Sequence, residues 1–337
     1  MIINFFFDNR IGGPHINIFK IANKFEKKKI LHVTVGKSNF AKFNLINLRF
    51  LSKLLYPVEV IINVFQIIFY FHKYNCIFLS NSIFNIAPII AGSLMRKKTF
   101  WYLLEEPNFI TKNIFFIFQK LFRFEVLSIS KKICKILNIK SYQYFPPYIN
   151  KKKYKKKIFN KKNLKIVSVG NINRVKNHFF AIKSLSNFKE NFEYDIIGAK
   201  INTQYDLYLS LKNFIKKNNL NNKVTLKGFK KNYEIKNILK KKDIFLLPST
   251  TEGCPVSLLE ALSEGKICIC SKVGDIPLII KNNFNGFLID LNEKSLLDIL
   301  KKIKKMNNNK INKIQFEAVK TINNRFSNTN YYKSVFD

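Results

Sequence analysis

The sequence is poor in the residues that build metal sites and disulfide frameworks. Its 337 residues include five cysteines and four histidines, and no two cysteines stand in a C-x-x-C spacing. Zinc sites draw on clustered Cys and His ligands, and disulfide frameworks use even numbers of cysteines. We therefore expect no metal site, and we expect Cys76, Cys134, Cys254, Cys268 and Cys270 to be reduced, structural thiols.

Long apolar runs are also missing. The longest, Val58–Phe71, is interrupted by Glu59, Asn63 and Gln66, and it falls short of the roughly 20 apolar residues that span a bilayer. The first ten residues, MIINFFFDNR, lack the basic region of a signal peptide, and their apolar run stops at Asp8. This pattern is typical of a first β-strand. On these grounds the sequence predicts a cytoplasmic protein.

Acidic residues are scarce relative to basic ones. There are 21 Asp and Glu against 59 Lys and Arg, which gives a net charge of +38 at pH 7. Such an excess occurs in nucleic-acid binders, and it also suits docking on an anionic membrane. Here the lysines are spread along the whole chain and accompanied by abundant Asn, Ile and Phe, a joint bias that AT-rich coding imposes on surface positions. This compositional origin is favoured over membrane attraction. Specific nucleic-acid binding is least favoured, because no recognised motif for it occurs.

The length is sufficient for two domains, and 47% hydrophobic with 15% aromatic residues is typical of a folded protein. In the first half, a loop at Gly12–Gly13 separates the first predicted strand from a predicted helix. The predicted strands are Ile2–Phe7, Ile30–Val35, Cys76–Ser80, Thr99–Leu104 and Glu125–Ile129, and the predicted helices are His15–Lys27 and Ile86–Arg96. Alternation of short apolar strands with helices favours a parallel, helix-covered sheet.

A domain boundary is predicted at the densest charge run, Lys151–Asn163 (KKKYKKKIFNKKN), which follows Pro146–Pro147. Such runs are usually solvated and flexible. Beyond it the alternation of strands and helices begins again. The predicted strands are Lys165–Val169, Tyr194–Gly198, Val224–Phe229, Asp243–Pro248, Lys266–Ser271 and Gly286–Ile289, and the helices are Asn177–Phe188, Tyr205–Asn218 and Tyr233–Lys240. The chain therefore predicts two Rossmann-like halves in tandem, followed by a helical tail from Ile311.

The most informative segment is Ser249–Glu264, STTEGCPVSLLEALSE, which holds Glu252 and Glu260. It follows a buried-type strand, and Pro255 near the start and Gly265 after the end are typical of a short helix. Glu252 is therefore expected on a loop at the carboxyl end of a strand, and Glu260 within the helix. Open α/β sheets bind ligands at that edge. Two carboxylates also suggest a glycoside hydrolase acid/base pair, a possibility that phosphate-binding features elsewhere disfavour.

Three loop-to-helix junctions are expected to bind phosphate. Helix N-termini offer backbone N–H donors and a favourable dipole to anions. The junctions are Gly12–Gly13, Arg174–Asn177 and Gly253–Pro255, and Lys176 stands immediately before a predicted helix start. A diphosphate is an anion of the size that such a set of donors and cations suits.

Together these blocks resemble the nucleotide-binding domain of the group 1 glycosyltransferases, also called glycosyltransferase family 4. The pattern E-G-x-P-x-x-x-L-E-A-x-x-x-G is matched by Glu252, Gly253, Pro255, Leu259, Glu260, Ala261 and Gly265. Upstream, VGNINRVKNH (Val169–His178) matches the phosphate-binding loop of the family. Downstream, SKVGDIP (Ser271–Pro277) and NGFLI (Asn285–Ile289) follow in family order. The resemblance is firm over Leu164–Asp290. In the first half it depends on the GGP loop, LSIS (Leu127–Ser130) and FPPYIN (Phe145–Asn150).

The resemblance implies the α/β GT-B fold, in which two Rossmann-like domains face each other across a cleft. An acceptor-binding domain is then expected at 1–150 and a nucleotide-sugar-binding domain at 164–310. The segment 311–337, which ends NRFSNTNYYKSVF, is expected to cross back and pack on the first domain.

The resemblance also assigns roles to individual residues. Glu260 is expected to accept hydrogen bonds from the ribose, and Glu252 to lie against the donor sugar. The family usually has Arg where this chain has Asn171, so Arg174 is expected to supply the guanidinium to the diphosphate. Glu252, Lys176 and Arg174 are the expected catalytic residues. The expected donor-binding residues are Gly12, Gly13, Gly170, Asn171, Lys176, Gly253, Cys254, Pro255, Val256 and Glu260.

On the acceptor side, His15, Glu105 and Glu106 are the candidates, while a solvated loop pair or a packing histidine explains the same residues without function. The resemblance implies a retaining hexosyltransferase of surface-polysaccharide or lipopolysaccharide assembly. Its partners would be a nucleotide diphosphate-sugar, a glycan or lipid-linked acceptor and an anionic inner leaflet. No D-x-D sequence occurs, so a metal-bridged diphosphate is not indicated, and no cofactor is expected.

Three other readings stay open. A GT-B-fold epimerase would rearrange a UDP-sugar without an acceptor. A non-catalytic relative that serves as a scaffold would account for Asn171. A nucleic-acid binder would account for the net charge.

Overall fold

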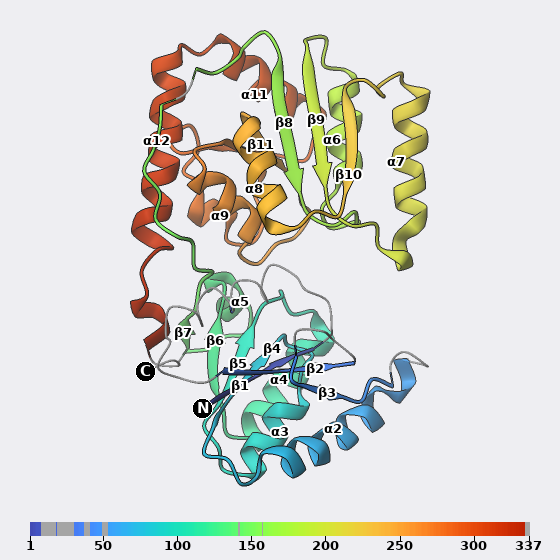
Figure 1. The fold of residues 1–337 in the computed structure, drawn as a ribbon, viewed down its shortest axis with the longest axis vertical. Helices are drawn as coiled ribbons and strands as arrows, with labels where there is room; N and C mark the ends of the chain where they lie inside the picture. Colours follow the sequence, from blue (N-terminus) through green and yellow to red (C-terminus); the bar gives the residue numbers. More distant parts are fainter. Residues whose placement is uncertain are drawn as a thin grey trace. The chain divides into compact units, whose positions relative to one another are not determined.

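The computed structural model describes residues 1–7, 18, 30–36, 41–48, 53–140, 142–156 and 158–333. The chain divides into two compact units, Met1–Tyr148 with Thr329–Asp337, and Ile149–Asn328. Each unit is built on its own parallel β-sheet with helices packed on it (Figure 1). The two-fold repetition of the strand–helix alternation predicted from the sequence is therefore present.

The first unit has a parallel sheet with the described strands in the order β3-β2-β1-β4-β5-β6-β7. The strands are β1 (Ile2–Phe6), β2 (Ile30–Val35), β3 (Phe43–Leu45), β4 (Ile77–Asn81), β5 (Thr99–Leu103), β6 (Glu125–Ser128) and β7 (Gln143–Tyr144). All five strands predicted for this half are confirmed within one or two residues. The predicted helix His15–Lys27 and the loop at Gly12–Gly13 lie outside the described residues.

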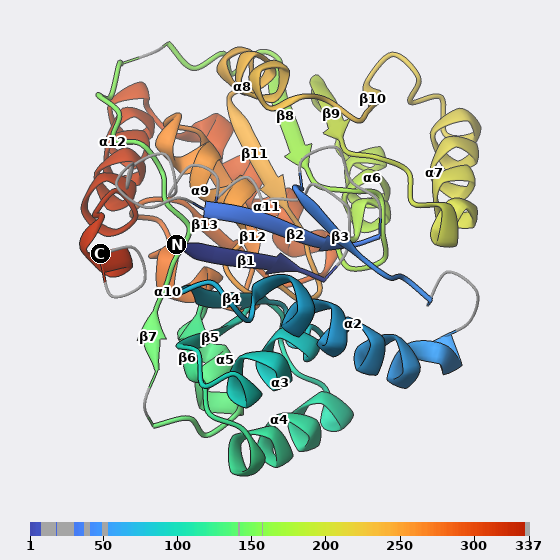
Figure 2. The same ribbon diagram turned by 60° about the horizontal axis from the view of Figure 1, so that its bottom comes forward.

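Helices of the first unit connect successive strands of this sheet. They are η1 (Lys53–Leu55), α2 (Tyr56–Phe71), α3 (Ala87–Leu94), α4 (Phe109–Leu121) and α5 (Lys131–Ile136). Figure 2 shows α2, α3 and α4 side by side on one face of the sheet. The apolar run noted in the sequence is α2, which has a proline in its first turn and packs Val60, Val64, Ile67 and Phe71 into the core.

The second unit has a parallel sheet in the order β10-β9-β8-β11-β12-β13. Its strands are β8 (Leu164–Val169), β9 (Phe192–Ile197), β10 (Val224–Gly228), β11 (Ile244–Leu247), β12 (Ile267–Ser271) and β13 (Phe287–Ile289). All six were predicted. The central strands β11 and β12 are buried along their whole length, because helices cover both faces of the sheet (Figure 1).

The helices of the second unit pack on both faces of its sheet. They are α6 (His178–Ser186), η2 (Asn202–Gln204), α7 (Tyr205–Lys217), α8 (Asn232–Lys241), α9 (Val256–Ser263), α10 (Ile276–Ile279), α11 (Glu293–Lys305) and α12 (Asn308–Arg325). Gly265, in the left-handed region at φ +64°, follows the end of α9 as predicted. Pro255 differs slightly from expectation, since it is the N-cap of α9 rather than a residue of its first turn.

The order of strands in the second sheet reverses at one point. From β8 the chain adds β9 and β10 on one side, and it then crosses to add β11, β12 and β13 on the other. The strands β8 and β11 are neighbours at this reversal. At the carboxyl edge of the sheet the chain therefore leaves them in opposite directions, toward β9 and toward β12. Such a switch point is the usual place for a ligand in an open α/β sheet.

The first domain, predicted to end at 150, ends at Tyr148, but the second unit begins at Ile149 and not at 164 as predicted. The charged run belongs to the second unit. Lys152 forms an ion pair with Glu264, the Tyr154 hydroxyl donates to Asn312 Oδ1 at 2.7 Å, and Phe159 is buried. The aromatic side chains among the lysines hold this run against the unit, so its composition did not make it a free linker.

The expectation that 311–337 packs as a whole on the first domain is also corrected. Helix α12 packs on α9 and β12 within the second unit, and it buries Ile311, Ile314, Ala318, Val319 and Ile322. Only the segment from Thr329 belongs to the first unit. There η3 (Asn330–Tyr332) buries Tyr332, whose hydroxyl donates to the Pro146 carbonyl at 2.9 Å.

All five cysteines are buried in their units, in line with structural roles. Burial raises the pKa of the Cys254, Cys268 and Cys270 thiols. Within the described ranges, no helix combines the length and the apolar character needed to cross a bilayer.

Candidate active site at the carboxyl edge of the second sheet

A backbone hydrogen bond joins the loop after β8 to the loop after β11. The Thr250 N–H donates to the Val175 carbonyl at 2.8 Å, which joins the two loops through their backbones. The strands β8 and β11 are adjacent and parallel, so both loops leave the sheet at its switch point. The two sequence blocks predicted to bind a donor, Val169–His178 and Ser249–Glu264, are therefore brought together.

The loop after β8 is shaped around Lys176. A Cβ on Gly170 would lie 2.9 to 3.2 Å from three carbons of the Lys176 side chain, so glycine gives this chain room to pass. The Lys176 N–H donates to Asn173 Oδ1 at 2.8 Å, and Asn177 then takes a left-handed conformation before α6 begins. The close turn fixes the direction in which the ammonium group points.

Lys176 and Glu252 form the central ion pair of the site. Nζ of Lys176 lies 2.6 Å from Oε1 of Glu252, and the two side chains are only 19% and 10% exposed. The same carboxylate oxygen accepts a hydrogen bond from the buried Ser249 hydroxyl at 2.6 Å. A largely buried pair with a third partner is held more rigidly than a surface pair. The two predicted catalytic residues from separate loops are thus in contact.

The backbone around Glu252 is held by the loop after β12. Gly274 has φ +55°, and a Cβ there would lie 1.8 Å from the Glu252 carbonyl oxygen. The Asp275 N–H donates to the Gly253 carbonyl at 3.0 Å. These contacts bring the SKVGDIP block against the glutamate loop and leave only glycine at position 274.

Several backbone N–H groups at the start of α9 are available for an anion. Among the described residues, the N–H groups of Gly253 and Cys254 donate to no protein acceptor. Val256 and Ser257 open the helix, where N–H groups have no intrahelical partner. Pro255 is the N-cap and contributes no N–H. The segment therefore offers a cluster of donors and a helix dipole next to Lys176 and Glu252.

Glu260 lies in the middle of α9 and is partly buried. Its backbone carbonyl accepts from the Ser263 hydroxyl at 2.8 Å, which strengthens the last turn of the short helix. As predicted, Glu252 lies on the loop and Glu260 lies within the helix. Its role toward a ribose stays a prediction.

Asn171 and Arg174 each contact another residue of the second unit. Asn171 Oδ1 accepts from the Ala199 N–H at 3.2 Å, which ties the loop after β8 to the loop after β9. The Arg174 side chain is 80% exposed, and Nη2 lies 3.8 Å from Oδ2 of Asp206. Asn171 thus binds backbone, while the Arg174 side chain lies in solvent near Asp206. Whether Arg174 reaches a diphosphate stays a prediction.

His178 supports the loop from beneath. Its Nε2 lies 3.2 Å from the Gly170 carbonyl oxygen, and the ring is buried in the first turn of α6. Burial lowers the pKa of His178 to about 4, the hydrogen bond to Gly170 opposes this, and the charge of Lys176 lowers it further. The ring is therefore neutral near pH 7 and donates its Nε2–H to the carbonyl.

Sequence patterns did not single out several residues that shape the site. Ser249 holds the Glu252 carboxylate, and Gly274 makes room for its carbonyl. Gly198 allows β9 to approach the loop after β8, since a Cβ there would lie 1.9 Å from the Gly170 carbonyl oxygen. Ser249 lies three positions before Glu252, and Gly274 lies inside the SKVGDIP block. Their positions within the motifs were the available signal in the sequence.

The acceptor candidates of the first unit have structural partners. Glu105 Oε2 accepts from the Ile83 N–H at 3.3 Å, and Glu106 Oε1 lies 2.8 Å from Nζ of Lys132 at the start of α5. Both residues follow β5 at the carboxyl edge of the first sheet. Gly12, Gly13 and His15 lie outside the described residues.

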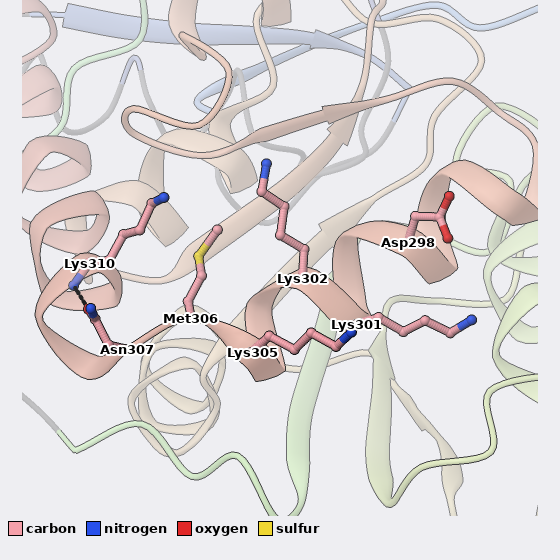
Figure 3. A pocket seen from close by; sticks show the side chains of 7 residues that line it. All are labelled: Asp298, Lys301, Lys302, Lys305, Met306, Asn307 and Lys310. Carbon is pink, nitrogen blue, oxygen red and sulfur yellow. Dashed lines mark hydrogen bonds between the residues drawn. The ribbon is translucent and has the colours of Figure 1, made fainter.

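A separate hollow of about 600 Å³ lies where α11 gives way to α12 (Figure 3). Four lysines dominate it, and it is lined by Asp298, Lys301, Lys302, Lys305, Met306, Asn307 and Lys310. None of the residues predicted from the motifs lines it. In the described part of the chain, no group of three or more His, Cys, Asp or Glu side chains is arranged to hold a metal ion.

A sequence model of the family described as "Glycosyl transferases group 1" matches residues 150–320, about half of the chain. The match covers the second unit almost completely, including both loops that meet at Lys176 and Glu252.

Curated proteins similar to the chain include two bacterial transferases. One is the Escherichia coli "UDP-Gal:alpha-D-GlcNAc-diphosphoundecaprenol alpha-1,3-galactosyltransferase", 36% identical over 165 residues, which are 48% of this chain and 42% of that protein. Another is the Erwinia amylovora "Amylovoran biosynthesis glycosyltransferase AmsK", 39% identical over 134 residues, 37% of this chain and 32% of that one. The aligned part thus spans less than half the length of these relatives.

Solved structures resemble the chain over nearly its whole length. Anabaena Alr3699/HepE in complex with UDP and glucose gives a TM-score of 0.84 at 15% identity, over 99% of this chain and 97% of that one. The lipopolysaccharide outer core galactosyltransferase WaaB gives 0.68 at 18% identity, over 96% and 98%. These likenesses establish the fold, and the α/β GT-B class with two Rossmann-like units is confirmed.

Proposed function

The chain belongs to the group 1 glycosyl transferases, and from that membership we propose that it transfers a sugar from a nucleotide diphosphate-sugar to a glycan or lipid-linked acceptor. The setting we propose is surface-polysaccharide or lipopolysaccharide biosynthesis. The names of the similar E. coli and Erwinia proteins support this setting.

One observation carries the proposal, namely the contact between Lys176 and Glu252 beside the start of α9. The 2.6 Å pair puts one cation and one carboxylate near the N–H groups of Gly253 and Cys254, which have no acceptor among the described residues. A nucleotide-sugar presents a diphosphate beside sugar hydroxyls, so it needs cationic and N–H donors next to a carboxylate acceptor. The switch-point loops offer that combination within one unit.

In the proposed reaction the bond between the sugar and the diphosphate breaks, and negative charge gathers on the leaving diphosphate. Lys176, Arg174 and the N–H groups at the start of α9 stabilise this charge more than that of the intact donor, which lowers the barrier. Glu252 accepts hydrogen bonds from the sugar, and Glu260 accepts them from the ribose. Gly170 and Asn171 support the loop beneath the diphosphate.

We further propose that the enzyme is a retaining hexosyltransferase of family 4 that needs no metal ion or cofactor. The leaving phosphate oxygen then takes the proton of the acceptor hydroxyl, while the hydroxyl oxygen forms the new bond on the same face of the sugar. Lys176 and the helix terminus supply the positive charge that a bridging metal ion would otherwise provide. The UDP named with the Anabaena structure supports a uridine donor as the first to test.

The acceptor is proposed to bind the first unit, where Glu105, Glu106 and His15 are the candidates from the sequence. The name of the similar E. coli protein includes a diphosphoundecaprenol-linked sugar, which favours a lipid-linked acceptor and work at an anionic membrane surface.

The test is donor binding followed by transfer. Thermal shift against UDP-, GDP- and ADP-sugars identifies the donor, and transfer of its labelled sugar is then assayed with polyprenyl diphosphate-linked sugars, with and without EDTA. Lys176→Ala is expected to lower the transfer rate about a hundredfold or more, since it removes a cation aimed at developing charge. The matched control is Lys304→Ala on α11, which breaks the 2.5 Å contact of Lys304 with Glu190 and leaves transfer unchanged.

Other outcomes discriminate the remaining functions. Release of a rearranged free sugar without any acceptor would indicate an epimerase, and no binding of any nucleotide diphosphate would indicate a scaffold. Loss of transfer in EDTA would contradict metal independence. An Arg174→Ala variant with unchanged donor affinity would remove Arg174 from the site.

A further inference from the structure

Helix α2 is apolar on the side that faces solvent as well as on the side that faces the core. Its outer side carries Leu54, just before the helix, Val58, Ile61, Phe65 and Phe69, here called the α2 stripe. Their spacing of four, three, four and four residues puts them on one side of the helix. Each is between 46% and 88% exposed. A surface helix normally shows polar residues to solvent, so this side is shaped for a non-aqueous contact.

Neighbouring helices extend the apolar surface at the C-terminal end of α2. Lys97 Nζ, after α3, donates to the Tyr74 carbonyl, after α2, at 2.6 Å. The Arg123 N–H, after α4, donates to the Ser93 hydroxyl of α3 at 3.1 Å. The C-terminal ends of the three helices therefore adjoin, on the face seen in Figure 2. Leu94 on α3 and Leu121 on α4 are exposed there as well.

This end of the helix layer is basic. Lys73, Arg96 and Arg123 are exposed directly after α2, α3 and α4. Between Leu54 and Arg123 the only acidic residues are Glu59, Glu105 and Glu106. Glu59 is buried and accepts from the Leu48 N–H at 2.8 Å, and the other two follow β5 at the opposite edge of the sheet. No carboxylate of this stretch therefore lies beside the three cations, and the exposed Glu125 just beyond it is matched by Lys98 at 3.7 Å.

We propose that the α2 stripe, with Lys73, Arg96 and Arg123 beside it, docks on the surface of an anionic phospholipid bilayer. Apolar side chains enter the boundary between headgroups and acyl chains, while the cations meet lipid phosphates. The other side of α2 stays in the core through Val64 and Phe71. A second copy of the chain fits the surface less well, because its net charge of +38 would be repelled. This docking rests on the proposed function in one respect only, namely that it would bring the enzyme to a lipid-linked acceptor.

Vesicle flotation of the full chain, without donor or acceptor, tests the surface separately from catalysis. Binding to phosphatidylcholine vesicles that contain phosphatidylglycerol is expected to exceed binding to phosphatidylcholine alone by about tenfold or more, and to weaken as salt rises. The double variant Phe65→Ser with Phe69→Ser is expected to lose about tenfold in binding to the anionic vesicles. The matched control, Phe229→Ser with Phe316→Ser, removes two exposed phenylalanines of the second unit and keeps wild-type binding.

A tryptophan reporter gives a second measurement that does not depend on a disruptive variant. The chain has one tryptophan, the buried Trp101, so Phe65→Trp adds a readable exposed one. Its emission is expected to shift to shorter wavelength on anionic vesicles and to be quenched by brominated lipid. The emission of the Phe229→Trp variant is expected to show neither change. Wild-type vesicle binding by the Phe65/Phe69 variant, or an unchanged Phe65→Trp spectrum, would overturn the proposal. The proposal would also be overturned if the Phe65/Phe69 variant lost a dimer while it still bound vesicles, because the stripe would then be a self-association surface.

Discussion

His178 is the residue whose surroundings most alter its chemistry. The ring is 2% exposed, and in the described part of the chain its Nδ1 has no hydrogen-bond partner. A charged ring would need a second acceptor there and would face the ammonium group of Lys176. The neutral ring needs only the Gly170 carbonyl, and through that bond it holds the loop on which Lys176 stands.

The low pKa of His178 predicts a stability that falls in acid. Its pKa is about 4 in the folded chain against an ordinary 6.5. Between these values the unfolded chain binds the proton and the folded chain does not, so stability rises with pH across this window and is lost as pH falls. From pH 7 to about pH 4.5, His178 should account for about 2 kcal/mol of lost stability.

The variant His178→Gln tests this contribution, because its amide can donate to Gly170 but does not titrate. Urea unfolding of both proteins at the two pH values should give a loss about 2 kcal/mol smaller for the variant. Equal losses would show that other groups carry the acid sensitivity.

At the scale of elements, the loop after β12 determines where the glutamate loop lies. Gly274→Ala is expected to destabilise the chain by about 2–4 kcal/mol, because φ of +55° and the Glu252 carbonyl at 1.8 Å both oppose a side chain. The displaced Glu252 loop should also weaken donor binding about tenfold. Urea unfolding and calorimetric titration with the donor measure the two effects.

Gly228 supplies the matched control for this change. It has φ of +66°, and nothing lies within 4 Å of a Cβ placed on it. Gly228→Ala therefore carries the same backbone strain without the clash, at about 1 kcal/mol and with unchanged donor binding. If both variants bound the donor alike, the close approach of Gly274 to Glu252 would not matter for the site.

The strands of the second unit could be predicted because each is a short apolar run bounded by glycine, proline or charge, whereas its helices α10 and α11 were not predicted. The helices α2 and α4 could not be predicted, since apolar residues on both their core and solvent sides remove the 3.6-residue pattern. In the site, the motifs identified Lys176 and Glu252 but not their contact. That contact depends on the path of Lys176 past Gly170 and on the Ser249 hydroxyl.

At the scale of the whole molecule, the chain passes between its two units twice, at Tyr148–Ile149 and again at Asn328–Thr329. The sequence indicated two units and a returning tail, but placed the first crossing in the lysine run. Charge composition describes solvation, whereas the position of the boundary depends on Tyr154 and Phe159, which attach that run to the second unit. For the tail, the deciding residue is Tyr332.

Tyr332 fastens the returning segment to the first unit. Its buried ring lies edge-on to Phe145 with 4.9 Å between centroids, and its hydroxyl donates to Pro146. Tyr332→Ala should destabilise the first unit by about 3–5 kcal/mol, through lost burial and the cavity left behind. Tyr332→Phe should cost about 1 kcal/mol, since only the hydrogen bond is lost.

Trp101 reports on this change selectively, because the only tryptophan of the chain is buried in β5 of the first unit. Its fluorescence in urea should therefore shift to a lower midpoint in Tyr332→Ala. Tyr331→Ala is the neighbouring control, since the Tyr331 ring is only partly buried beside Tyr144 and its loss should move the midpoint much less. Equal shifts for the two alanine variants would mean that the tail as a whole, and not the Tyr332 side chain, stabilises the first unit.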